Sequence, residues 1–127
     1  MPRRAQKLDG ESFESRSARL LEDYGLRIIA RRFSCRRGEI DLIAVDAHQL
    51  LFVEVRARQS RRFGGALASV DARKRGKLAH CAQRFLQTHP QWRHLPCRFD
   101  VIAWEPDNSG AEPRALHARW IQAAFLV

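Results

Sequence analysis

The stretch GEIDLIAVDAHQLLFVEVRAR, residues 38–58, decides the fold that this sequence predicts. It holds two apolar runs, 39–45 and 50–57, on either side of the polar tetrad DAHQ. Runs rich in Ile, Leu, Val and Phe around a short polar turn are typical of a β-hairpin. Each run also carries one carboxylate among its hydrophobic residues, Asp41 in the first and Glu54 in the second.

A symmetric hairpin centred on the tetrad places Asp41 directly opposite Glu54, and Glu39 opposite Arg56. Side chains alternate between faces, so one face is expected to be pure core, made of Ile40, Leu42, Ala44, Leu51, Val53 and Val55. On the other face the Cβ atoms of the two acids are expected about 5 Å apart. Two ionised carboxylates at that distance repel by roughly 3 kcal/mol at an effective dielectric of 20, so something must compensate them.

Two explanations account for the paired acids. A divalent cation between them would turn repulsion into attraction, and Mg²⁺ favours one or two carboxylates together with water and phosphate oxygens. Alternatively, Arg56 and Arg58 neutralise the acids as a surface ion-pair cluster, or a bulge shifts the register. The pattern of the hairpin alone leaves both explanations open.

The composition indicates a globular protein with a polyanionic partner. The chain has 127 residues, of which 45% are hydrophobic and 29% charged, enough for one domain with a sizeable core. Its 23 Lys and Arg against 14 Asp and Glu give a net charge of +9, mostly from arginine, whose planar fork suits phosphate. Nucleic acid is therefore the leading partner. A charge that serves solubility alone is the alternative.

The sequence predicts neither a membrane segment nor a secretory signal. Its apolar runs, such as LLFV at 50–53, are far shorter than the roughly 20 residues of a membrane span. No apolar segment follows the basic start MPRRAQK, so we expect residues 1–8 to be a flexible basic tail and 9–127 to form one domain. The cysteines are three in number, Cys35, Cys81 and Cys97, and they have no CxxC spacing. An odd number without that spacing indicates reduced thiols and a cytoplasmic location.

Periodicity predicts two helices, about 10–24 capped by Asp9 and 70–88 capped by Ser69. Gly25 is expected to end the first helix. Apolar runs bounded by turn residues predict five strands, at 25–35, 39–45, 50–57, 97–104 and about 115–122. The order α-β-β-β-α-β-β predicts an α/β fold with a mixed central sheet flanked by helices.

The pattern Asp41-x12-Glu54-x-Arg56 resembles the PD-(D/E)xK nuclease core, whose αβββαβ order matches the predicted one. In that restriction-endonuclease-like core, two acids on neighbouring strands hold the metal, and a basic residue follows two positions after the second acid. From about Glu14 to Phe125 the chain also resembles the bacterial YraN-type family of uncharacterised, endonuclease-like proteins. The segments that carry this resemblance are GEIDLIA, FVEVRAR, RFG, SVDARKRGKL, RFDVIAW and WIQAAF.

The resemblance implies a metal-dependent endonuclease that hydrolyses the phosphodiester backbone of nucleic acid, with Mg²⁺ or Mn²⁺ as cofactor. DNA is the expected partner rather than RNA, although the sequence does not decide between them. It implies that Asp41 and Glu54 are catalytic metal ligands and that Glu14, on the first helix, completes the acidic cluster. A solvated helix acid is the alternative for Glu14. A homodimer that cuts two strands is compatible with this reading, and the sequence does not decide the oligomeric state.

Two departures from the nuclease pattern affect the expected chemistry. Ile40 stands where the pattern has proline, and Arg56 stands where it has lysine. Arginine cannot act as a general base, because its pKa exceeds 12, but it can stabilise charge on a phosphoryl group. Lys74 lies between Val70 and Leu78 at i±4 spacing, so its amine either replaces the missing lysine or extends to solvent.

Further charged residues divide into expected phosphate contacts and structural groups. Glu39 is expected to be the ion-pair partner of Arg56, and Asp100 a structural acid at the start of a strand. His89, His94 and Cys97 match no zinc-finger spacing. The expected nucleic-acid contacts are Arg58, Arg61, Arg62, Lys74 and Lys77. For Arg58, Arg61 and Arg62, which belong to the loop after the strand 50–57, the alternative is an ordinary solvated loop.

Three functions remain open on the sequence alone. The first is a metal-dependent nuclease that uses Asp41 and Glu54, helped by Arg56 and Lys74. The second is a nucleic-acid-binding protein that keeps the nuclease fold without its chemistry, which Arg56 in the lysine position motivates. The third is a protein-interaction domain in which the carboxylates pair only with arginines.

Overall fold

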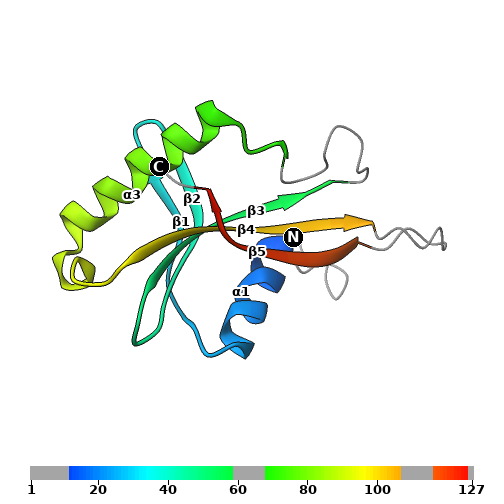
Figure 1. The fold of residues 1–127 in the computed structure, drawn as a ribbon, viewed down its shortest axis with the longest axis horizontal. Helices are drawn as coiled ribbons and strands as arrows, with labels where there is room; N and C mark the ends of the chain where they lie inside the picture. The colour runs from blue at the N-terminus through cyan, green and yellow to red at the C-terminus, as the bar shows by residue number, and fades with distance from the viewer. Residues whose placement is uncertain (1–11, 59–67, 107–115, 126–127) are drawn as a thin grey trace, which may run out of the picture.

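The structure, a computed structural model, describes residues 12–58, 68–106 and 116–125. Within them a five-stranded mixed sheet runs in the order β1-β2-β3-β4-β5, with β3 and β4 parallel and the other neighbours antiparallel. Figure 1 shows helices α1 and α3 on opposite sides of this sheet. The elements are α1 (Phe13–Asp23), β1 (Arg27–Cys35), β2 (Gly38–Val45), β3 (Leu50–Ala57), α3 (Ala72–Thr88), the short 3-10 helix η3 (Pro90–Trp92), β4 (Cys97–Pro106) and β5 (Leu116–Phe125).

This arrangement confirms the predicted α/β class, with a mixed central sheet flanked by helices. The predicted tail, residues 1–8, lies outside the described residues. Neither described α-helix is long and apolar enough to cross a membrane.

Both helices begin at a cap residue other than the predicted one. Ser12 caps α1, where its Oγ accepts the Ser15 N–H at 3.0 Å, in place of the predicted Asp9, which lies outside the described residues. Asp71 caps α3 by accepting the Lys74 N–H at 3.0 Å, in place of Ser69. Ser and Asp are comparable caps, so helix propensity does not choose between cap-competent residues that lie two or three positions apart.

Gly25 ends α1 as predicted. Its φ of +89° is a left-handed conformation that glycine adopts without strain. The Leu26 N–H then donates to the Leu21 carbonyl at 3.1 Å, and the Gly25 N–H donates to the Glu22 carbonyl at 2.9 Å. These two bonds form a Schellman motif, which directs the chain from α1 into β1.

The β2–β3 hairpin has the predicted register. Asp46 Oδ1 accepts the N–H groups of His48 and Gln49, at 2.8 and 3.0 Å, and closes the turn. The observed backbone pairs are Val45 with Leu50, Ala44 with Leu51, Ile43 with Phe52, and Leu42 with Val53.

Both faces of this hairpin are buried, which differs from the prediction of one core face. One face packs under α1, with Leu42, Ala44, Leu51 and Val53, and the other packs under α3, with Ile43, Val45, Leu50 and Phe52. The hairpin lies in the middle of the sheet, so each face has a helix to cover it.

Alternation along β2 breaks at Asp41. Ile40 belongs to the core on the α3 side, whereas the prediction placed it with Leu42 on the opposite side. The break coincides with Arg32, which lies across the β1–β2 pair between the partners Arg31–Leu42 and Phe33–Ile40. Arg32 has a φ of +48°, a left-handed conformation that turns the strand locally.

Helix α1 is attached to the sheet through the indole of Trp104. Its Nε1 donates to the buried Ser17 Oγ at 2.8 Å, the Phe13 ring lies 5.3 Å from its ring, and the Arg16 guanidinium lies 4.4 Å above it. These contacts fix the first turn of α1, and therefore Glu14, relative to β3 and β4.

Cys35 at the end of β1 and Cys81 in α3 form a disulfide, with their Cα atoms 5.4 Å apart. The prediction of reduced thiols was therefore wrong for these two residues, while Cys97 is free and exposed. The two cysteines lie 46 positions apart in sequence, and only the packing of α3 on β1 brings them within bonding range.

Asp100 is a structural residue, as predicted. Its carboxylate is completely buried and accepts two bonds from Arg98, at 2.8 and 2.9 Å, one from Trp120 Nε1 and one from the Ala123 N–H. The β4–β5 register shifts at this point, and Ala123 has a φ of +49°. Asp100 thus stabilises a bulge that bends β5.

Candidate functional site

The candidate site lies where β2 and β3 separate. Their backbone pairing ends at Leu42 and Val53, after which β3 continues to pair only with β4, and β2 only with β1. Asp41 Oδ2 accepts the Val55 N–H at 2.8 Å at the point of separation. A side chain of β2 therefore continues the contact with β3 after the main-chain ladder has ended.

The structure brings the Asp41 and Glu54 side chains together, although the backbones of these residues no longer pair. The negative charge of Asp41, and its hydrogen bonding to the Glu54 carboxyl group, both favour the protonated form of Glu54. Burial is the larger cause, since the Glu54 residue is only 4% exposed. Together these effects raise the pKa of Glu54 from 4.5 to about 7 against the opposing charges of Lys74 and Arg56.

Two cations lie beside Glu54. The amine of Lys74 and the Nε of Arg56 are each 3.3 Å from Glu54 Oε2. Lys74 therefore points into the site, which the sequence had left open. Its position follows from the start of α3, because Asp71 caps the helix and fixes the first turn over the end of β3.

The two carboxylate oxygens of Glu54 have different surroundings. Oε2 contacts both cations, while Oε1 is buried without a hydrogen-bond partner. Among buried side-chain nitrogen and oxygen atoms of residues 12–58, 68–106 and 116–125, only Glu54 Oε1 and Arg56 Nε lack a hydrogen-bond partner. Both atoms are at this site, but Arg56 Nε has its ion-pair contact with Oε2, so Glu54 Oε1 is the atom left without a partner, at a cost of about 1–3 kcal/mol.

Glu14 lies at the margin of the site. Its carboxylate is 3.7 Å from Arg32 Nε, and its side chain is 18% exposed. Burial raises the pKa of Glu14, Arg32 opposes the rise, and the nearby charge of Asp41 adds to it. Asp41 thus interacts electrostatically with both Glu54 and Glu14.

Asp41 interacts with each of the other two acids, but Glu14, Asp41 and Glu54 do not form a three-carboxylate cluster. Within the part of the chain that the structure describes, no three Asp, Glu, His or Cys side chains already converge on one point. Asp41 and Glu54 are the two carboxylates that the structure brings together, and they are the candidate ligands for a cation. The unpartnered Glu54 Oε1 beside a second carboxylate fits a hard divalent cation, which prefers oxygen ligands.

One predicted contact at the site was wrong. Glu39 is not the ion-pair partner of Arg56, because its carboxylate accepts the hydroxyl of Ser34 at 3.3 Å and Arg56 contacts Glu54 instead. The prediction assumed that the hairpin register continues past Asp41. Since the strands separate there, Glu39 pairs across β1 with Ser34.

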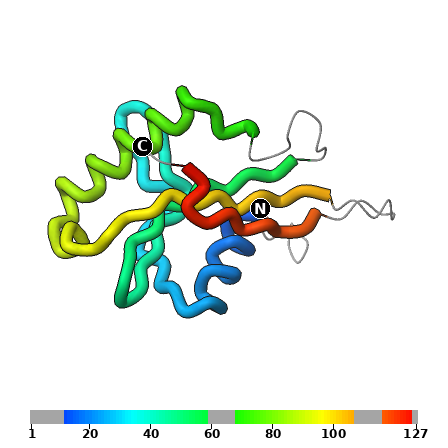
Figure 2. Tube along the Cα trace, viewed as in Figure 1, coloured from blue at the N-terminus to red at the C-terminus, as the bar shows by residue number. Residues whose placement is uncertain are grey.

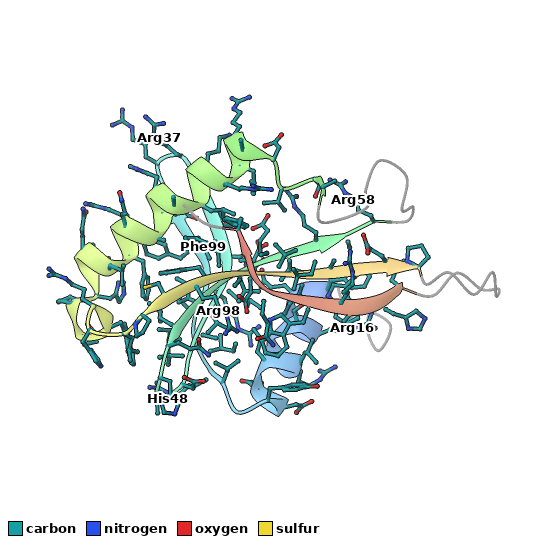
Figure 3. The ribbon with its side chains drawn as sticks, viewed as in Figure 1. Arg16, Arg37, His48, Arg58, Arg98 and Phe99 are labelled. Atoms are coloured by element: carbon teal, nitrogen blue, oxygen red, sulfur yellow. A yellow bond between two sulfur atoms is a disulfide. The ribbon has the colours of Figure 1, made fainter. Side chains whose placement is uncertain are left out.

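The predicted nucleic-acid contacts lie on both sides of the site. Arg58 follows β3, where its N–H donates to the Trp104 carbonyl at 2.9 Å and its side chain is exposed (Figure 3). Lys77 lies one helical turn after Lys74 and packs near Gly38. Arg61 and Arg62 lie outside the described residues.

Sequence reasoning missed Arg32 as part of the site. The left-handed conformation of Arg32 within a strand leaves no signal in the apolar pattern. Glycine is the residue type whose presence in a sequence usually indicates such a conformation. The charge of Arg32 could be read from the sequence, but its place opposite Asp41 depends on the β1–β2 register.

Comparison with known proteins identifies the family. The model of the Uncharacterised protein family UPF0102 matches residues 13–104. A UPF0102 protein of Alcanivorax borkumensis is 48% identical over 122 residues, which cover 96% of this chain and 94% of the relative. UPF0102 proteins of Pseudomonas fluorescens and Pseudomonas syringae pv. tomato are 47% and 42% identical, over 91% and 98% of both chains.

The matched region contains α1, the whole β2–β3 hairpin and α3, and therefore each described residue of the candidate site. The family resemblance predicted from the sequence is thereby confirmed. This chain is a member of the UPF0102, or YraN-type, family of proteins.

Proposed function

We propose that this protein is a metal-dependent nuclease that hydrolyses phosphodiester bonds in nucleic acid, with DNA as its preferred substrate. Its cofactor is Mg²⁺ or Mn²⁺, held by Asp41 and Glu54 with Glu14 nearby. The fold is proposed to be a restriction-endonuclease-like core of the PD-(D/E)xK type. The element order αβββαβ and the acids at the separation of two strands support this assignment.

The observation that carries the proposal is the state of Glu54. A carboxylate that is 4% exposed, next to a second carboxylate and with one oxygen unpartnered, is costly in a protein that uses it only for folding. Perturbed acids of this kind are concentrated at functional sites. A divalent cation would satisfy the free oxygen and remove the repulsion between the two acids.

Each residue of the site has a distinct part in the proposed reaction. Asp41 is held rigidly by the Val55 N–H, which fixes its carboxylate for ligation. Lys74 and Arg56 place two positive charges beside the acids, where they would stabilise the negative charge that develops on the phosphoryl group. A guanidinium group cannot act as a general base, so a proton acceptor in this site has to be a group other than Arg56.

The bound cation would supply Lewis-acid stabilisation of the same phosphoryl charge. The net charge of +9 would attract the substrate and hold its backbone over the site.

A nucleic-acid-binding protein without catalysis is the second candidate. The specific observation in its favour is that Lys74 and Arg56 both already contact Glu54 Oε2, which partly neutralises the acid without any metal. That protein would bind nucleic acid in a salt-dependent manner and give no Mg²⁺- or Mn²⁺-dependent product.

A cleavage assay separates the two candidates. Metal-free protein is incubated with branched, single-stranded and duplex DNA and with RNA, in the presence of Mg²⁺, Mn²⁺ or a chelator. We expect metal-dependent products from wild type and from Asp23→Asn, a control that neutralises an exposed carboxylate of α1, and none from Asp41→Asn. Equal cleavage by Asp41→Asn would remove the nuclease proposal.

A further inference from the structure

A second cationic site lies on the α3 side of the molecule, away from Asp41 and Glu54. A pocket of about 620 Å³ opens between the end of β1 and the outer face of α3. Figure 2 shows the β1–β2 turn beside α3, so the two walls of this pocket come from segments far apart in the chain. Its polar lining includes Ser34, Arg36, His80, Gln83, Arg84 and Gln87.

The lining has the chemistry of a phosphate contact. Two guanidinium groups, two side-chain amides, an imidazole and hydroxyl groups face one space, and no Asp or Glu is among the lining residues. Arginine, amide and hydroxyl donors of this kind make most protein contacts to nucleic-acid backbones. One carboxylate is near, since Glu39 accepts the hydroxyl of Ser34, but it does not line the pocket.

The pocket is connected to the candidate site along α3. Lys74 contacts Glu54, Lys77 lies one turn further, and Arg84 reaches the pocket after ten residues of the helix. At a rise of 1.5 Å per residue, Lys74 and Arg84 are separated by about 15 Å along the helix axis. That length matches about four base steps of one DNA strand.

The disulfide joins the two walls of the pocket. Cys35 lines it from the end of β1, and Cys81, to which it is bonded, belongs to α3. The wall that carries Arg36 is therefore covalently fixed to the wall that carries His80 and Arg84. Figure 3 shows that Arg37, the next residue of the turn, projects outward beside the same helix.

We propose that this pocket, with Lys77, is a second anchor for the nucleic-acid backbone, which extends the bound strand from the Asp41–Glu54 site along α3. The inference rests on the proposed function only in taking nucleic acid as the ligand. Its substrate would be a duplex or duplex arm long enough to reach both sites, and a shorter one would bind only the first.

The test measures binding without cleavage. Duplex DNA is titrated, in chelator, with the Asp41→Asn protein and with the same protein carrying Arg36→Ala and Arg84→Ala, over a range of salt concentrations. The matched control carries Arg27→Ala and Arg93→Ala, two exposed arginines that are not among the lining residues of the pocket, of which Arg27 lies at the opposite end of β1 from Arg36. Melting curves verify that each variant is folded.

We expect the Arg36/Arg84 variant to bind a long duplex about tenfold or more weakly, and to reduce the slope of log K against log salt by about two. The loss should be absent on a duplex too short to reach the pocket, and the Arg27/Arg93 control should leave both quantities nearly unchanged. Equal behaviour of the two double variants would overturn the inference.

The same assays distinguish this failure from failure of the proposed function. If Asp41→Asn cleaves as well as wild type while the Arg36/Arg84 variant binds weakly, the nuclease site is wrong and the anchor stands. If Asp41→Asn is inactive while the two double variants bind equally, the anchor is wrong and the nuclease site stands.

Discussion

Asp41 of β2 accepts the backbone N–H of Val55 in β3 through Oδ2, at 2.8 Å. This bond lies just beyond the last main-chain pair of the two strands, Leu42 and Val53. It therefore fixes a carboxylate at the edge of the gap between the strands, close to Glu54. Asp41 satisfies a backbone donor and is also the proposed cation ligand, and two substitutions can separate these roles.

Asp41→Asn should keep the fold and lose the chemistry, because the amide oxygen of asparagine can still accept the Val55 N–H. Asp41→Ala leaves that N–H without its partner, which costs about 1–3 kcal/mol. Urea denaturation of the metal-free proteins should therefore give a lower free energy of unfolding for the alanine variant than for the asparagine variant. Equal stability of the two would mean that the bond does not contribute.

Stability should depend on pH through Glu54, whose pKa is raised to about 7. Between about pH 4.5 and 7 the folded state holds a proton that the unfolded state has released, so the free energy of unfolding falls as pH rises. The total effect of this group is on the order of 3 kcal/mol. Because Glu54→Gln cannot ionise, its melting temperature should match wild type near pH 4 and exceed it near pH 8.

The quantity compared is the difference in melting temperature between wild type and Glu54→Gln, both metal-free. Contributions from titratable groups that the two proteins share cancel in this difference. A difference that stays constant from pH 4 to pH 8 would show that Glu54 titrates normally.

Lys74→Met removes a positive charge 3.3 Å from Glu54 Oε2. The pKa of Glu54 should rise further, because Lys74 is one of the two charges that lower it. The cleavage rate should fall by about a hundredfold or more, the usual effect of removing one group that stabilises transition-state charge. Nuclear magnetic resonance of the Glu54 carboxyl carbon follows the first effect, and the cleavage assay follows the second.

The matched control is Arg73→Met, which removes a neighbouring but exposed charge from the same turn of α3. If both methionine variants lose activity equally, Lys74 acts only through the general field of the helix.

Asp100→Ala should destabilise the fold without a specific effect on catalysis. The substitution leaves the Arg98 side chain, the Trp120 indole and the Ala123 N–H without their common acceptor. Breaking a buried ion pair in this way costs about 3–5 kcal/mol. Chemical denaturation should detect the loss, while the activity per folded molecule stays near that of wild type. A stable variant that has lost cleavage would instead place Asp100 in the reaction.

The sequence predicted most of the architecture, because the strongest signals are local. The apolar runs 42–45 and 50–53 and the turn at Asp46 determine one register, and the structure has that register. Gly25 marked the end of α1 for a similar reason, since a left-handed residue is needed there. Cap residues were predicted less well, because Ser69 and Asp71 are equally good candidates from the sequence alone.

The details of the site could not be predicted, because they depend on where β2 and β3 separate. That point coincides with the turn of β1 at Arg32, and neither the left-handed conformation of Arg32 nor its position opposite Asp41 has a signal in the sequence. The mistaken pairing of Glu39 with Arg56 has the same origin. The Cys35–Cys81 bond was missed because it depends on the packing of α3 on β1. The number and spacing of the cysteines give no information about that packing.

The central claim is that Asp41 and Glu54 bind one divalent cation together. Calorimetric titration of metal-free protein with Mn²⁺ tests it directly, using wild type, Asp41→Asn, Glu54→Gln and the control Asp23→Asn. We predict binding of one ion to wild type and to Asp23→Asn, and loss of that binding in both site variants. Undiminished Mn²⁺ binding by Asp41→Asn and by Glu54→Gln would contradict the claim.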